Sequence, residues 1–152
     1  MESATLEFGK VHILSISIGE DVLETIEKFL VEKGIQQAII LNGYGALTQY
    51  RVHWVLHNQL PSKPVFGSGE GGIEILSMSG IILEGKPHVH VTLSSQGGAF
   101  GGHMEKGCIA YVLCEVFIAE ISGAVLKHLR LPISLPGIGE GKVYYLSIDE
   151  EK

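Results

Sequence analysis

The stretch from Pro87 to Met104, PHVHVTLSSQGGAFGGHM, constrains the fold most tightly because polar and apolar residues alternate along its first half. Successive side chains of a β-strand point to opposite faces, so His88 and His90 share one face while valines occupy the other. A segment with four glycines follows and is expected to form a loop that folds His103 back over the strand end. The pattern therefore predicts a half-buried strand with three histidines gathered on its polar face.

Three imidazoles that meet at one point form a candidate metal site. Catalytic zinc sites typically use three protein ligands and keep a fourth position for water. Iron, nickel and copper also accept imidazole ligands. The alternative is a solvated strand face that happens to carry two histidines, and the spacing of His88, His90 and His103 alone leaves both interpretations open.

Chemistry at a metal would also need a general acid or base within hydrogen-bond reach. Glu105, two residues after the third histidine, and Glu74, on the neighbouring predicted strand, are the candidates. Glu115 lies in an apolar strand and needs a partner, either the distal N–H of a metal-bound histidine or a polar edge position. His53 and His57 are four residues apart in a predicted strand, too far to chelate together, so we do not expect them to be ligands.

The remaining sequence predicts one helix and several strands. The helix is expected from Asp21 to Lys33, with Asp21 and Glu24 as a capping box and Gly34 as the C-terminal stop. β-Branched and aromatic residues predict the strands, which are Val11–Ile18, two runs within Gln37–His57, Ile73–Leu83, the histidine strand, Cys108–Ile121, Val125–Ser134 and Val143–Ile148. The two runs within Gln37–His57 are broken at Asn42–Gly45, whose glycines are expected to form a bulge or a sharp bend. Asn58–Gly72 holds two prolines and four glycines and is expected to be a surface loop. No repeat or linker is present, which predicts a single domain over residues 1–152.

The chain carries little charge for a soluble domain. Charged residues make up 18% of it, against about 25% on average, so we expect copies of the chain to cover each other's apolar surface in a closed ring. The strand Cys108–Ile121 is apolar on both faces, which predicts a central place in the sheet or a subunit contact. Cys108 and Cys114 lie too far apart in that region to pair and are expected to be buried thiols.

Charge and hydropathy also bear on partners. The net charge of −6, with only 11 lysines and arginines, argues against tight nucleic-acid binding. Apolar runs fall short of the ~20 residues of a membrane span, and the N-terminus lacks the pattern of a signal peptide. We therefore expect a cytoplasmic protein that does not enter membranes.

Four blocks resemble, in order, the plants-and-prokaryotes conserved (PPC) domain in its bacterial and archaeal form. They are GYGAL (43–47), EILSMSGII (74–82), PHVHVTLSS (87–95) and GGHMEKGC (101–108). The resemblance implies an α+β domain, mainly antiparallel β-sheet with a flanking helix, broadly similar to the acetolactate decarboxylase fold and assembling as a homotrimer. It also implies a divalent metal, with zinc as first choice, on His88, His90 and His103.

The family is often labelled DNA-binding, through plant members that carry an Arg-Gly-Arg-Pro hook. This sequence lacks the hook and has Gly72 where the plant form has an arginine. The resemblance thus implies a metal-binding protein of binding or regulatory type. DNA is a partner by the family label that the sequence disfavours, and a small-molecule ligand is a second possible partner. The alternative is a metal-dependent lyase or hydrolase acting on a small carbonyl substrate, whose catalytic residues the sequence does not reveal.

Overall fold

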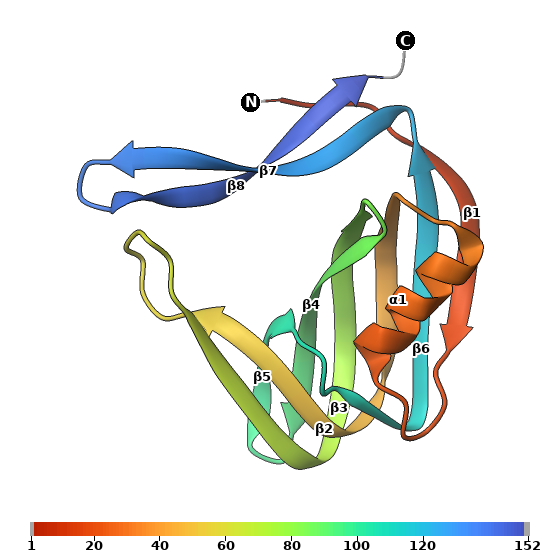
Figure 1. Ribbon diagram of the computed structural model, residues 1–152. Helices are drawn as coiled ribbons and strands as arrows, with labels where there is room; N and C mark the ends of the chain where they lie inside the picture. Colours follow the sequence, from red (N-terminus) through yellow and green to blue (C-terminus); the bar gives the residue numbers. More distant parts are fainter. Residues whose placement is uncertain (1, 151–152) are drawn as a thin grey trace.

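The computed structural model of the protein describes residues 2–150, so the expected domain of residues 1–152 extends beyond the described part at both ends. Its elements in chain order are β1 (Glu7–Ser15), α1 (Val22–Lys33), β2 (Ala38–Val55), β3 (Pro64–Leu83), β4 (Lys86–Ser95), β5 (Gly98–Met104), β6 (Ile109–Ser122), β7 (Ala124–Leu135) and β8 (Gly139–Glu150). Six strands form one sheet in the order β1-β6-β2-β3-β4-β5, and β7 and β8 form a separate hairpin (Figure 1). All of these pairings are antiparallel, which confirms the prediction of a mainly antiparallel fold with one helix.

The long strand β2 closes one end of the sheet on itself. Its first part pairs with β6 as far as Gln49, and further along Val52 and His53 pair with β5. The β2–β6 register shifts on both sides of the Asn42–Gly45 segment, so Gly43 and Gly45 belong to bulges inside a continuous strand. Gly45 has φ +147, and a Cβ there would lie 2.2 Å from the Leu113 carbonyl oxygen. Strand β2 thereby leaves β6 and pairs with β5, which brings β2, β4 and β5 together.

The helix matches its predicted ends. Asp21 is the N-cap, and its carboxylate accepts a hydrogen bond of 3.0 Å from the backbone N–H of Glu24. Gly34 ends the helix in the left-handed conformation with φ 67. The buried face of the helix consists of Val22, Leu23, Ile26 and Leu30, which belong to the main core together with sheet residues. None of the helices in the described part is long and apolar enough to cross a membrane.

Parts of two predicted loops are strands, namely residues 64–72 in β3 and the residues from Gly98 onward in β5. The segment expected as a surface loop enters β3 at Pro64 and pairs with β2 from Val55 onward. Its glycines leave room for aromatic rings: a Cβ at Gly67 would lie 2.5 Å from the Trp54 ring, and one at Gly69 would lie 2.7 Å from the Tyr50 ring. The glycines before His103 likewise belong to β5 and pair with β4. In both places glycine permits close packing, whereas the sequence suggested a turn.

Strand β6 lies between β1 and β2, in agreement with the predicted central position. Cys108 and Cys114 are buried and unpaired, as expected, and burial raises the pKa of each thiol to about 11. Near its start, however, β6 presents apolar side chains to solvent, and Val112 is 71% exposed. Within one chain, therefore, the three consecutive residues Tyr111, Val112 and Leu113 are exposed to solvent.

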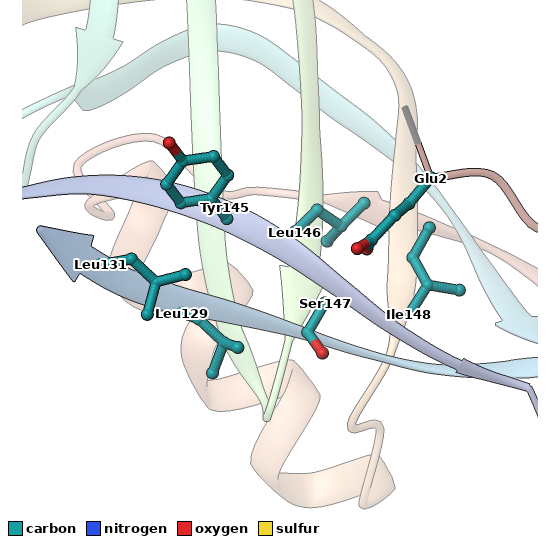
Figure 2. Close-up of a pocket in the computed structure, with 7 residues that line it drawn as sticks. All are labelled: Glu2, Leu129, Leu131, Tyr145, Leu146, Ser147 and Ile148. Carbon is teal, nitrogen blue, oxygen red and sulfur yellow. The ribbon is translucent and has the colours of Figure 1, made fainter. Parts of the chain in front are cut away.

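The β7–β8 hairpin forms an arm that crosses above the sheet (Figure 1). Its base packs through Ala124 and Leu126 against Leu83 and Ile121. Beyond the base, apolar side chains of the arm line a shallow hollow, shown in Figure 2 with Glu2, Leu129, Leu131, Tyr145, Leu146, Ser147 and Ile148. None of the predicted histidine ligands lines this hollow.

Candidate metal centre

The three predicted histidines lie together in the folded chain. His88 and His90 project from the exposed face of β4, and the valines between and after them are buried, as the alternation predicted. His103 on β5 lies directly opposite His90 in the β4–β5 register. One ring nitrogen from each histidine lies within 4.8 Å of those of the other two. The cluster is thus assembled by one hairpin, β4–β5.

The spacing of the rings suits a tetrahedral ion. The Nε2 atoms of His88 and His90 are 3.2 Å apart, whereas two nitrogens at a Zn–N distance of about 2.0–2.1 Å would be separated by about 3.3–3.4 Å along a tetrahedral edge. The His88 and His90 ring centres are 5.2 Å apart, and His103 lies 4.5 and 5.5 Å from them, nearly perpendicular to both rings. A direct N–H···N hydrogen bond between His88 and His90 fits the same short distance.

The environment favours imidazoles with free lone pairs at two of the three positions. The pKa of His103 is lowered to about 4, first by burial and then by the neighbouring His88 and His53, while Glu105 opposes the shift. The pKa of His88 is also lowered, first by burial and then by His90, His128 and His53. A metal binds only the unprotonated ring. Both histidines therefore remain able to bind a cation in mildly acidic solution.

His53 belongs to this cluster, which the sequence prediction missed. It lies opposite His103 in the short β2–β5 pairing, and the two ring centres are 4.4 Å apart. Its Nδ1 lies 2.7 Å from Oε1 of Glu105. His57, which the sequence suggested as the neighbour of His53, lies instead in the exposed loop after β2. A contact across two distant strands leaves no local spacing signal that could have revealed His53.

His128, at the base of the arm, is a further neighbour that the sequence did not indicate. Its ring centre lies 5.9 Å from that of His88. The cluster opens onto a shallow depression lined by His53, Trp54, Val55, His88, His90, Gly102 and His103. The indole N–H of Trp54 donates to the Gly101 carbonyl, which ties the rim of this depression to β5.

Of the three candidate carboxylates, only Glu105 lies at the cluster. Glu74 is exposed and pairs with Ser94, four residues beyond His90 and hence about 13 Å along the strand. Glu115 accepts a hydrogen bond of 2.5 Å from the Tyr44 hydroxyl, and this bond is the main reason that the pKa of Tyr44 is raised. The alternative in which Glu115 orients a histidine of the cluster is therefore wrong.

Comparison with known proteins places these features in a wider context. A family model described as the Plants and Prokaryotes Conserved (PCC) domain matches residues 3–122. Among curated proteins, the chain is 27% identical over 114 residues to the bifunctional protein GlmU of a Synechococcus strain; the match covers 73% of this chain but only 17% of that protein.

Solved structures resemble the whole fold. A metal-containing protein from Archaeoglobus fulgidus is 30% identical with a TM-score of 0.73, covering 95% of this chain and 99% of that one. A plant- and prokaryote-conserved protein from Pyrococcus horikoshii is 27% identical with a TM-score of 0.70, covering 92% and 96%. A structure from Bacteroides thetaiotaomicron, named as a candidate DNA-binding protein, has a TM-score of 0.66 and covers 92% and 96%, but at 20% identity the likeness concerns the fold alone.

Proposed function

The chain belongs to the Plants and Prokaryotes Conserved (PCC) domain family, and from that premise we propose that it is a metal-binding protein of binding or regulatory type. The proposed ion is divalent, with zinc as first choice, and its ligands are His88, His90 and His103. The observation that carries this proposal is the convergence of three imidazoles from two adjacent strands, with one ring nitrogen of each within 4.8 Å of the other two. The Archaeoglobus relative, named as metal-containing, supports it.

A zinc ion with three histidine ligands would keep one coordination position for an outside ligand. The depression beside His90 and His103 offers that position access from solvent. A bound ion acts as a Lewis acid toward carbonyl or carboxylate oxygens and acidifies a bound water. We therefore expect the natural ligand to be a small molecule with an oxygen donor.

The test is metal analysis of the purified chain after chelator treatment and reconstitution with zinc. We expect at least one ion per chain at neutral pH. His90→Ala should remove the tightest-bound ion because it deletes one of three ligands, whereas His57→Ala, which changes an exposed histidine outside the cluster, should not. Absence of bound zinc in the wild-type chain, or equal zinc affinity in the wild type and His90→Ala, would refute the proposed site.

A second candidate is a metal-dependent lyase or hydrolase that acts on a small carbonyl substrate. The observation in its favour is the His53–Glu105 pair, 2.7 Å apart, beside the proposed ion. Such a pair could accept or deliver a proton near a substrate held by the metal. Turnover of small carbonyl compounds by the zinc-loaded chain, lost in Glu105→Gln but with zinc binding at the three histidines retained, would favour this candidate over a binding role.

DNA is a partner that relatives suggest but that the charge of this chain opposes. The chain has a net charge of −6, and phosphate binding depends on lysine and arginine contacts. We propose that this domain alone binds duplex DNA weakly. Sub-micromolar affinity at about 150 mM salt, falling steeply as salt rises, would contradict this proposal.

We also propose that the chain, taken as one domain over residues 1–152, assembles as a homotrimer through β6. The exposed apolar residues of β6 include Val112, which is 71% exposed, and those of neighbouring β1 include Val11 and Ile13, each 59% exposed. Large exposed apolar patches mark interaction sites in soluble proteins, so these exposed side chains on two adjacent strands support an interface there. The number of subunits comes from the family resemblance, and sedimentation at micromolar concentration tests it against a 16.4 kDa monomer.

A further inference from the structure

A second group of metal-binding atoms lies next to the first. His53, His103 and Glu105 each place a nitrogen or carboxylate oxygen within 4.8 Å of the other two. The three residues come from β2, from β5 and from the residue just after β5. All three are partly buried, whereas His88 and His90 are exposed. This second group is therefore the more enclosed of the two.

The donor set has a recognisable chemistry. Two imidazoles and one carboxylate are the ligands of several catalytic zinc sites and of the facial triad that holds Fe(II) with open positions. Glu105 is the only carboxylate at the cluster, and in the part of the chain that the structure describes no lysine or arginine lies within ion-pair distance of it. Its closest polar partner is the ring nitrogen of His53, at 2.7 Å. A cation would find a carboxylate there that no lysine or arginine of the described residues neutralises.

We propose that His53, His103 and Glu105 form a second position for a divalent transition metal, distinct from the three-histidine position and sharing His103 with it. The hydrogen bond between His53 and Glu105 does not prevent this, because a neutral imidazole can carry its proton on Nε2 and leave Nδ1 free to bind. Ions enter from the depression, since His53 and His103 both line it.

Sharing His103 couples the two positions. An ion at one position withdraws a ligand from the other and repels a second cation, so the wild-type chain binds its second equivalent much more weakly than its first. Removing the ligands unique to the three-histidine position should then leave the second position intact and easier to measure. His88 and His90 are exposed, so replacing both is expected to preserve the fold.

The experiment titrates Co²⁺ into the chelator-treated full chain, because the visible absorption of Co²⁺ reports its coordination. The starting chain is the double variant His88→Ala/His90→Ala, and Glu105→Gln or His53→Ala is added to it in turn. The control is the double variant with Glu115→Gln added, because Glu115 bonds Tyr44 away from the cluster. Circular dichroism verifies that each variant is folded. We expect the double variant to bind about one Co²⁺ per chain. Adding Glu105→Gln or His53→Ala should lower its Co²⁺ affinity at least tenfold, because mutation of residues that only hydrogen-bond to metal ligands already lowers metal affinity by that much. The control should bind as the double variant does.

The outcomes separate this inference from the proposed function. If the wild type binds Co²⁺ and the double variant does not, the second position is refuted and the three-histidine position stands. If the double variant binds Co²⁺ but neither Glu105→Gln nor His53→Ala weakens it, the ion lies elsewhere and the inference is again refuted. If the double variant binds in a Glu105-dependent way while His90→Ala leaves wild-type affinity unchanged, the second position stands and the first one fails.

Discussion

Acidification of the metal-free chain tests the electrostatics of the cluster directly. An ordinary histidine with a pKa of about 6.5 is about 90% protonated at pH 5.5, but one with a pKa of about 4 is only about 3% protonated. Burial and the neighbouring histidines lower the pKa of His103 to about 4. We therefore expect its ring to stay neutral at pH 5.5, where an ordinary histidine ligand would already have lost about tenfold in apparent metal affinity.

The same shift fixes how stability depends on pH. The pKa of His103 is lower in the folded chain than in the unfolded chain, so protons bind the unfolded state better. The contribution of the neutral His103 ring to the free energy of unfolding is therefore complete above about pH 6.5 and is lost as the pH falls toward about 4. A shift of that size corresponds to at most about 3.4 kcal/mol in the free energy of unfolding, and to roughly half as much for a ring still partly screened by solvent.

The assay follows the ring protons of each histidine by NMR in the chelator-treated chain from pH 8 to pH 3.5. The His103 signal should titrate near pH 4. In His88→Ala its midpoint should rise only part of the way toward 6.5, because burial is the largest cause of the shift and His88 is the second. A wild-type midpoint near 6.5 would show that the ring is not desolvated, and full recovery in His88→Ala would show that charge outweighs burial.

Three substitutions test the packing around the site. Gly102→Ala should lower the free energy of unfolding by about 1–3 kcal/mol and weaken Co²⁺ binding, because a Cβ there would lie 2.7 Å from the His53 carbonyl oxygen. The control is Gly72→Ala, because a Cβ at Gly72 has nothing within 4 Å, and equal unfolding midpoints of the two variants would contradict the prediction. Asp21→Ala should cost about 1 kcal/mol in denaturant unfolding, since Asp21 caps α1 and also accepts from the Gly107 N–H, and no measurable change would show that water replaces both bonds. Val112→Asp should give aggregated or unfolded chain on sedimentation, whereas Val31→Asp, at an exposed helix position, should not. A soluble, folded Val112→Asp chain that sediments with the same mass as the wild-type assembly would place the subunit contact elsewhere.

Local patterns in the sequence were sufficient for the helix and for the two faces of β4, although they missed β5 and the first part of β3. The capping residue Asp21 and the stop at Gly34 predicted both ends of the helix, because each acts on backbone groups within a few residues. The alternation around His88 and His90 predicted a shared face, because side-chain direction in a strand is a property of that strand alone. The glycine-rich segment before His103 indicated this residue as a third candidate ligand, and the family resemblance then implied a metal on all three histidines.

Tertiary structure decided which other residues surround the cluster. His53 and His103 are 50 positions apart in the sequence, and they meet because β2 leaves β6 and pairs with β5. His128 approaches His88 from the separate β7–β8 arm, in the same way. The glycines of β3 were misread for a related reason: their role depends on rings of Trp54 and Tyr50 in the partner strand. Strand pairing joins residues that are remote along the chain, so no local periodicity records which side chains it will bring together.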